Sequence, residues 1–335
     1  MDPRLPLRDV AGYARRVEAM GFDGLHVAET VHDALAVSLL AAEHTERIVI
    51  RTSVALAFVR SPTLTAYAAW DLARFSGGRF QLGLGTQIRQ NIEERMAMPW
   101  SEPVTRMRDY VAALQALFAA FRDGGAPDHQ GDVYRITRLQ PYFNPGRDAE
   151  TTPPMIWLGG VNAAMCQLAG EVAAGFVSHP TNSNPRYLDE ICLPNLFVGL
   201  EQAGRDRSML EVVVGPAVVT GATDADLVAE RERQRRMVAF LYSTPAYART
   251  LELYGWTGLG DDLRSLIRDD RWDDLSAVVH DEVLDTLLPI GRYDQLGAVL
   301  LERYAGRADG IALGPQPDAA NDEHVASLVA DLRAG

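Results

Sequence analysis

The sequence predicts an α/β protein in which parallel strands alternate with helices along most of the chain. The first third reads as helix, strand, helix, strand, helix and strand, an order that implies parallel strands joined by right-handed crossovers. The same alternation resumes after residue 154. With 335 residues, of which 47% are hydrophobic, the chain is long enough to bury a sizeable core, and its length suits one large α/β domain or two small ones.

The segment Ser76–Thr86 combines a helix end, a short strand and the start of a loop. A glycine pair ends the preceding helix, because glycine readily adopts the left-handed conformation found there. The apolar strand that follows contains Gly83 and Gly85, and glycines inside a strand indicate close backbone approach. Ligands of parallel α/β proteins bind at the carboxyl ends of strands, which makes Thr86 and Gln87 candidates for contact. The alternative is a crowded barrel interior that requires small residues.

Hydrophobic periodicity and capping residues locate the other elements. Ser61 and Pro62 are typical of a helix start, with serine as the cap and proline in the first turn. Pro194 is expected to kink the helix that contains it. The expected helices are 10–20, 34–44, 61–75, 106–122, 163–173, 185–203, 224–242, 293–304 and 323–332, and another helix is expected to start at 243–245. The expected strands lie near residues 25, 50, 82, 156, 177, 215 and 312.

Three segments interrupt this alternation, near 87–103, 124–154 and 254–288. The first is a long loop that contains Trp100, and long loops at strand ends are often lids or binding loops. The second is rich in glycine, proline and aspartate, with a hairpin-like stretch at 133–139. The third reads as additional helical material. We interpret all three as insertions in a single domain over residues 1–335.

The strand count predicts a barrel whose first strand is truncated. An eight-stranded barrel requires one more strand before the first helix, and only residues 1–7 are available there. Pro3 and Pro6 make this segment poor strand material, because proline lacks the N–H that a central strand donates. Two explanations stay open: the chain as given starts downstream of its natural first residue, or another segment covers the gap.

Charge and composition argue against several functional classes. The net charge of −13 disfavours binding to nucleic acid or to an anionic membrane surface. No apolar run reaches the length of a membrane span and no signal segment opens the chain, so a cytoplasmic location is expected. Cys166 and Cys192 lack metal-ligand spacing, and no metal is expected. All basic residues are arginine, a composition typical of GC-rich bacterial genomes. The oligomeric state stays open, with a homodimer as one alternative.

Polar residues follow several of the predicted strand ends. Glu29 and His32 come after the strand near residue 25, where a carboxylate and an imidazole can transfer protons. His179 ends the strand near residue 177. The turn Gly159–Asn162 lies between a strand and a helix, where free backbone N–H groups can bind a phosphate. Each has a structural alternative, namely a solvated histidine or a plain tight turn.

Taken together, these motifs resemble the luciferase-like oxidoreductases, and within them the branch that uses the deazaflavin coenzyme F420. The resemblance extends over nearly the whole chain, and the order and spacing of its motifs are more specific than any one of them. The motifs are Gly21–Gly24, Ser76–Phe80, Leu82–Thr86, Pro99–Trp100, Arg106–Tyr110, Leu168–Glu171 and Ser243–Tyr247.

The resemblance implies a TIM (β/α)8 barrel with insertions that binds a flavin-type ring at the carboxyl ends of its strands. Ser53–Val54 matches the position of a non-prolyl cis peptide that supports the ring, and Glu29 matches an acidic residue near it. The remaining matches are a loop beside the ring and a phosphate-binding turn, formed by Gly85, Thr86 and Gln87 and by Gly160, Val161, Asn162 and Ala163. We also expect Trp100 and His179 to line the substrate pocket.

Two departures from the family pattern affect the predicted chemistry. Several deazaflavin enzymes have a histidine where this chain has Thr30, so His32 becomes the candidate for proton transfer. The phosphate turn lacks a glycine-proline pair that relatives often have, which predicts altered coenzyme affinity. The expected function is hydride transfer between coenzyme F420 and a small organic substrate. The alternatives are an FMN-dependent monooxygenase and a degenerate barrel that binds a ligand without turnover.

Overall fold

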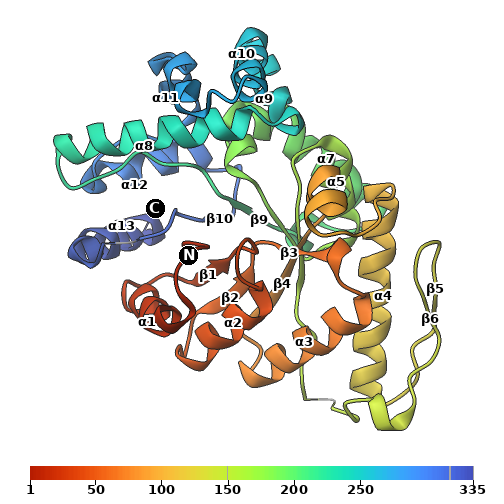
Figure 1. Ribbon diagram of the computed structural model, residues 1–335. Helices are drawn as coiled ribbons and strands as arrows, with labels where there is room; N and C mark the ends of the chain where they lie inside the picture. Colours follow the sequence, from red (N-terminus) through yellow and green to blue (C-terminus); the bar gives the residue numbers. More distant parts are fainter. Residues whose placement is uncertain (149, 317, 335) are drawn as a thin grey trace. The chain divides into compact units, whose positions relative to one another are not determined.

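The structure is a computed structural model that describes residues 1–148, 150–316 and 318–334 (Figure 1). It divides into two compact units, each made of several stretches of chain. Unit 1 comprises Met1–Gly159, Gln167–Phe176 and Gly199–Leu210, and unit 2 comprises Gly160–Cys166, Val177–Val198 and Glu211–Gly335. The two units are described separately, and the single domain over 1–335 stays a prediction.

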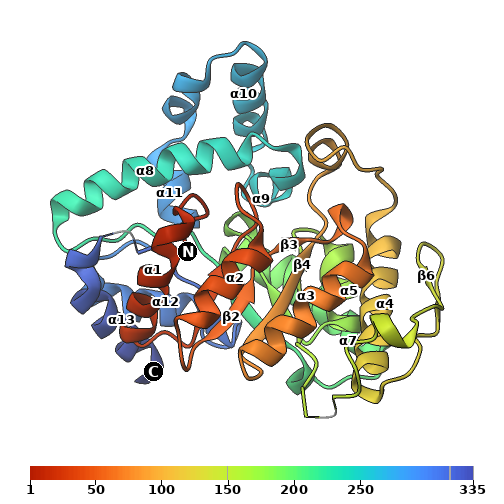
Figure 2. The ribbon, with the colours of Figure 1, turned by 60° about the horizontal axis from the view of Figure 1, so that its bottom comes forward.

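Unit 1 contains the alternating helices and strands expected for the first part of the chain. Their bounds are α1 (Val10–Ala19), β1 (Gly24–Val27), α2 (Ala34–Glu43), β2 (Val49–Thr52), β3 (Ala55–Leu56), α3 (Pro62–Phe75), β4 (Phe80–Gly85), α4 (Pro103–Asp123), β5 (His129–Gln130), β6 (Arg135–Ile136) and β7 (Ile156–Gly159). β1 pairs with β2, β2 with β4, and β4 with β7, all in parallel. Helices α2 and α3 lie side by side next to these strands (Figure 2).

Local capping explains where two of these helices begin. The Ser61 hydroxyl accepts a hydrogen bond from the Leu64 N–H at 3.2 Å, and Pro62 occupies the first turn of α3, which confirms the predicted start. The Asp33 carboxylate caps α2 by accepting from the N–H groups of Leu35 and Ala36 at 2.8 and 3.1 Å. Both helices therefore start where a side-chain oxygen satisfies otherwise unpaired backbone donors.

Two insertions in unit 1 differ from the sequence-based prediction. The segment 87–103, expected to be a plain loop, contains a π-helical turn at Asn91–Arg95. The hairpin expected at 133–139 instead pairs β5 with β6 in antiparallel fashion. The carboxylate of Asp109 on α4 fixes the connecting turn, because it accepts from the N–H groups of Val133 and Tyr134 at 2.6 and 2.7 Å. A contact with α4, which is distant in the sequence, therefore fixes the register between β5 and β6. The local sequence did not define this register.

Unit 2 contains most of the later elements. Their bounds are α6 (Pro185–Tyr187), β9 (Glu211–Val214), α8 (Asp224–Tyr242), α9 (Ala248–Leu253), α10 (Thr257–Arg268), α11 (Asp281–Leu287), α12 (Tyr293–Tyr304), β10 (Gly310–Ile311) and α13 (Asp322–Ala334). Three further elements have residues in both units, namely α5 (Ala163–Val172), β8 (Gly175–Val177) and α7 (Leu193–Gln202). β9 and β10 pair in parallel, with Val213 opposite Gly310.

The helix expected at 185–203 is divided in the structure. A π-helical turn at Leu188–Cys192 separates α6 from α7. Pro194 lies just after this turn, and its missing N–H cannot bond to the carbonyl of Glu190 four residues earlier. The structure therefore has a widened helical turn on the amino-terminal side of Pro194, and the kink in the helix axis stays a prediction.

The insertion at 254–288 is helical, as predicted, and contributes to a hydrophobic core of its own. Its helices α10 and α11 supply Leu263 and Leu284, which are both fully buried. α8 and α9 contribute Ala239 and Leu251 to the same cluster. Figure 2 shows α10 next to α8. The insertion therefore forms part of the hydrophobic core of unit 2.

The residues before α1 form a turn and a short 3-10 helix at Leu7–Asp9. No strand is present among residues 1–9, all of which the structure describes. This conformation agrees with the prediction that Pro3 and Pro6 prevent a strand here.

Helix length and hydropathy bear on membrane insertion. Helix α2 is apolar along most of its 10 residues, whereas a transmembrane helix needs about 20 residues. Within the described stretches of the chain, no helix combines the length and the apolar character needed to cross a membrane.

Candidate active site

The strand expected near residue 50 is divided into β2 and β3, with a cis peptide bond between Ser53 and Val54. The predicted cis peptide is therefore confirmed. Arg51 lies opposite Gln81, and Ala55 lies opposite Leu84. Between these two pairs the β2–β3 segment advances by four residues, whereas β4 advances by three. This mismatch is a β-bulge, a feature that is common next to active sites.

Two glycines of β4 allow this bulge to approach. An ideal Cβ on Gly83 would lie 1.9 Å from the carbonyl oxygen of Thr52, and one on Gly85 would lie 2.4 Å from Cγ2 of Val54. The Thr52 hydroxyl donates to the Gly83 carbonyl at 2.7 Å and accepts from the Gly83 N–H at 2.8 Å. The close backbone approach predicted from the glycines is thus confirmed at Gly83, whereas the close neighbour of Gly85 is the Val54 side chain.

The loop after β4 begins with an uncommon backbone conformation. Gln87 has φ = 60°, in the left-handed region that residues other than glycine seldom occupy. Its side-chain oxygen accepts from the Ile88 N–H at 3.0 Å, and the Thr86 hydroxyl donates to its carbonyl at 3.1 Å. Local hydrogen bonds therefore hold the loop that is predicted to lie beside the flavin-type ring in a strained backbone conformation. Such conformations are found at ligand sites.

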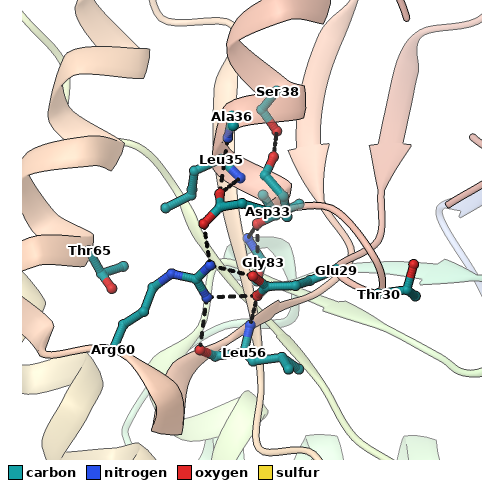
Figure 3. Close-up of polar contacts among 12 residues, drawn as sticks. Glu29, Thr30, Asp33, Leu35, Ala36, Ser38, Leu56, Arg60, Thr65 and Gly83 are labelled. Carbon is teal, nitrogen blue, oxygen red and sulfur yellow. Dashed lines mark hydrogen bonds and ion pairs between the residues drawn. The ribbon is translucent and has the colours of Figure 1, made fainter. Parts of the chain in front are cut away.

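Glu29 lies at the centre of an ion-pair cluster in unit 1 (Figure 3). Both of its carboxylate oxygens accept from the Arg60 guanidinium, and one of them also accepts from the Leu56 N–H at 2.6 Å. Arg60 also contacts the Asp33 carboxylate at 2.6 Å. The Glu29 and Arg60 side chains are 9% and 18% exposed, so the pair is largely removed from water.

This cluster changes the ionisation of two of its members. Burial acts to raise the pKa of Asp33, but the hydrogen bond and charge of Arg60 outweigh it, and the net pKa lies below the usual value. The hydrogen bond to Glu29 and the contacts with Asp33 raise the pKa of Arg60. The cluster therefore consists of a permanent cation and an Asp33 carboxylate that stays ionised at neutral pH.

His32 lies in the loop between Glu29 and Asp33, whose carboxylates both form ion pairs with Arg60. The loop carries no regular secondary structure, and the His32 side chain is half-buried. Because Glu29 and Asp33 are both fixed, the backbone that carries His32 is restrained on both sides. The direction in which the imidazole faces, and its role in proton transfer, stay predictions.

Trp100 packs near the end of the 87–103 segment. Its ring makes an edge contact with Phe58, with ring centroids 6.0 Å apart. The Arg106 guanidinium lies over the Phe58 ring, 4.3 Å from the ring centroid, and donates to the Pro99 carbonyl at 2.8 Å. At the other side of this segment, Arg95 donates to the Thr30 carbonyl at 2.6 Å. The segment is thus anchored to the loop that follows β1.

A partly buried polar chain crosses the strands of unit 1, and the sequence did not reveal it. The Arg51 guanidinium contacts Nε2 of His26 at 3.0 Å and donates to Gln81 at 2.7 Å. It also lies 3.2 Å from the ring centroid of Trp157. Burial and the charge of Arg51 lower the pKa of His26 to about 3, so its imidazole is neutral and accepts from Arg51.

In unit 2, the predicted phosphate turn connects the end of β7 to α5. The carbonyls of Gly160 and Val161 accept from the side chains of Asn182 and Tyr187, at 2.9 and 2.5 Å. The Asn162 side chain caps α5 by accepting from the Met165 N–H at 2.9 Å. These contacts fix the turn through its carbonyl groups.

The amino end of α5 is also open enough to receive an anion. Ala163 and Ala164 are exposed and have short side chains, and the first N–H groups of a helix lack intrahelical partners. The residues present therefore fit the phosphate of a flavin-type coenzyme.

His179 begins a polar loop after β8. Its ring stacks on Tyr247, with centroids 4.9 Å apart and an angle of 13° between the planes. Tyr247 belongs to the motif Ser243–Tyr247, so a segment quoted only for its resemblance supplies a direct neighbour of a predicted site residue. Arg60, by comparison, carried no sequence signal, because a single arginine before a helix cap is usually a solvated side chain.

A cavity of about 530 Å³ in unit 1 lies away from these residues. α4 and the segment around β7 contribute Phe118, Arg122 and Ile156 to its lining, and Arg205 completes one side. The predicted site residues do not line this cavity, so it is separate from the candidate site.

Comparison with known proteins identifies the fold and the family. A family model described as luciferase-like monooxygenase matches residues 2–310. An uncharacterized protein of Mycobacterium tuberculosis is 40% identical over 99% of this chain and 97% of its own length. A 5,10-methylenetetrahydromethanopterin reductase of Archaeoglobus fulgidus is 27% identical over 88% of this chain and 85% of its own length.

A solved structure extends the likeness to three dimensions. The coenzyme F420-dependent tetrahydromethanopterin reductase from Methanopyrus kandleri has a TM-score of 0.82 at 19% identity, over 99% of this chain and 96% of that protein. This likeness confirms the TIM-barrel fold that the family resemblance implied. Since the family model covers nearly the whole sequence and the motifs around the cis peptide and the β4 glycines are in place, the chain belongs to the luciferase-like monooxygenase family.

Proposed function

We propose that the protein transfers a hydride between the deazaflavin coenzyme F420 and a small organic substrate. The observation that carries this proposal is the near full-length relationship to a methylenetetrahydromethanopterin reductase, together with the fold of an F420-dependent reductase. The bulge at Ser53–Val54 and the restrained loop at Gly85–Gln87 support it from within unit 1. In unit 2, the turn Gly160–Ala163 supports it as a phosphate site.

The coenzyme, when bound, supplies the carbon that donates or accepts the hydride. The protein contributes positioning: the backbone at Ser53–Val54 and the loop Gly85–Gln87 would support the ring, and the α5 N-terminus would bind the phosphate. Trp100 and His179 would contact the substrate. Glu29, whose two oxygens are already engaged by Arg60, would act near the ring as a fixed negative charge.

A binding titration tests the cofactor assignment. We expect fluorescence titration to give a micromolar or lower Kd for coenzyme F420 and a clearly higher Kd for FMN. Ala163→Asp should weaken F420 binding by at least about 10-fold, because it places a negative charge beside the phosphate. The same aspartate is favourable at a helix N-terminus, so thermal stability should be maintained. Equal affinity for both cofactors, or a preference for FMN, would refute the assignment.

His32 is proposed as the proton donor or acceptor. We expect His32→Ala to lower turnover by about 100-fold, the usual contribution of general acid–base catalysis, without changing coenzyme affinity. His44→Ala is the matched control, since His44 lies at the other end of α2 and bonds to the Leu40 carbonyl. If His32→Ala turns over as fast as the wild type on an identified substrate, the proton-transfer role is wrong.

The family description favours one alternative, an FMN-dependent monooxygenase. A deazaflavin handles hydrides and does not activate oxygen, so oxygen uptake with reduced FMN would support the monooxygenase. A third alternative is a barrel that binds coenzyme without turnover. Tight F420 binding without reaction of any ketone, imine or enone probe would favour that alternative.

A further inference from the structure

The cavity of about 530 Å³ in unit 1 lies at the amino end of β7. Ile156, the first residue of β7, and Phe118, on the carboxyl-terminal half of α4, give it an apolar wall. Its volume suits a small organic molecule, since ligand pockets in proteins span about 300–1,000 Å³. The predicted coenzyme contacts follow the carboxyl ends of strands, so a ligand in this cavity would not occupy the candidate active site.

Arg205 places a guanidinium on one side of this cavity. Nη1 of Arg205 donates to the Gly170 carbonyl at 2.5 Å, and Nη2 donates to the carbonyls of Ala173 and Met209 at 2.6 and 2.9 Å. Within the described stretches of the chain, Arg205 forms no ion pair with a carboxylate, so its partners orient the cation without neutralising its charge. Burial lowers the pKa of Arg205, the direction expected for a cation without a counter-ion.

The Glu171 carboxylate also lines the cavity, but its charge is already neutralised. Nε and Nη2 of Arg108 on α4 donate to it at 3.1 and 2.6 Å. Arg122 is a second cation in the lining, and its contact with Asp123 at 3.0 Å lies at the exposed surface, where ion pairs are weak. The cavity therefore combines an excess of positive charge with an apolar wall.

We propose that this cavity binds a small organic carboxylate with an aromatic or branched hydrocarbon body. The carboxylate accepts hydrogen bonds from Arg205, and the hydrocarbon packs on Phe118 and Ile156. Hydrogen bonds between a guanidinium and a carboxylate are strong because both groups are charged. The apolar wall favours such a ligand over an inorganic anion, which has no hydrocarbon to bury. This site is independent of the proposed hydride transfer.

Two probes of nearly the same shape test the role of charge. Calorimetric titration should show saturable binding of hydrocinnamate, at least about 10-fold tighter than binding of the uncharged hydrocinnamyl alcohol. Arg205→Met should remove this preference, while the affinity for the alcohol stays the same. A purely structural role of Arg205 would instead change both affinities by the same factor.

Substitutions at exposed positions of α4 give a second test, because Arg205→Met also removes contacts at the end of α5. Ala119 and Gln115 are exposed and line the cavity. Ala119→Trp should fill the cavity and abolish binding of both probes. Gln115→Glu should weaken hydrocinnamate binding by about 5-fold through charge repulsion. Gln130→Glu, the same change at an exposed position outside the cavity, should leave both affinities unchanged.

Three results would overturn the proposal. They are the absence of saturable hydrocinnamate binding to the wild type, equal affinity for the acid and the alcohol, and binding that survives Ala119→Trp, since the probe would then lie elsewhere. The titrations are made without coenzyme, so failure of the protein to bind F420 would refute the proposed function and leave this site standing.

Discussion

Replacing Gly83 with alanine is expected to lower the free energy of unfolding by about 3 kcal/mol, the upper end of the usual cost of overpacking. The new Cβ would lie 1.9 Å from the Thr52 carbonyl oxygen. This neighbour is backbone, so relief requires β2 to move away from β4. That movement would also break the two hydrogen bonds between the Thr52 hydroxyl and Gly83. Urea unfolding followed by circular dichroism measures the loss.

Gly12 provides a matched control for this substitution. Gly12 lies within α1, and an ideal Cβ there meets no atom within 4 Å. Gly12→Ala should therefore stabilise the protein by about 0.5–1 kcal/mol through the higher helix propensity of alanine. Thr52→Val keeps the side-chain shape and removes both hydrogen bonds, at a cost of about 1–3 kcal/mol. Equal stability of Gly83→Ala and the wild type would contradict the close approach of the two strands.

Replacing Arg60 with alanine is expected to lower the free energy of unfolding by about 3 kcal/mol, because it leaves Glu29 as a largely buried charge without its partner. The loop between Glu29 and Asp33 would lose the contact that joins its two ends. Backbone amides of this loop should exchange hydrogen faster than in the wild type. Urea unfolding and hydrogen exchange by mass spectrometry measure the two effects.

The stabilising effect of Arg60 should also depend on pH. The folded-state pKa of Asp33 is lowered, so its contribution is fully present above the unfolded-state pKa and is lost as the pH falls through the folded-state value. The difference in stability between the wild type and Arg60→Ala should therefore shrink between neutral pH and about pH 3. Arg89→Ala is the control, because Arg89 pairs with Glu93 at the exposed surface and such pairs add little stability. A difference that is the same at both pH values would contradict this account.

Much of the candidate site was predictable, but from two different kinds of signal. Gly83 and Gly85 indicated close backbone approach by themselves, since a strand interior seldom contains two glycines without a packing reason. The cis peptide at Ser53–Val54 came from the family resemblance, because two ordinary residues in a β-rich segment carry no local signal for it. Arg60 was missed altogether. Its partner Glu29 lies 31 positions away in the sequence.

The sequence by itself determined the alternation of helices and strands in this protein. Hydrophobic periodicity, helix caps such as Ser61, and the irregularity near Pro194 depend on residues that are close in the chain, so they can be read without a structure. Only the tertiary structure decided the hairpin held by Asp109, the ion pair of Glu29 with Arg60, and the lowered pKa of His26. The hairpin and the ion pair depend on hydrogen bonds between residues that the fold brings together from distant positions. The lowered pKa of His26 depends on burial and on the charge of Arg51, which the fold places beside the ring.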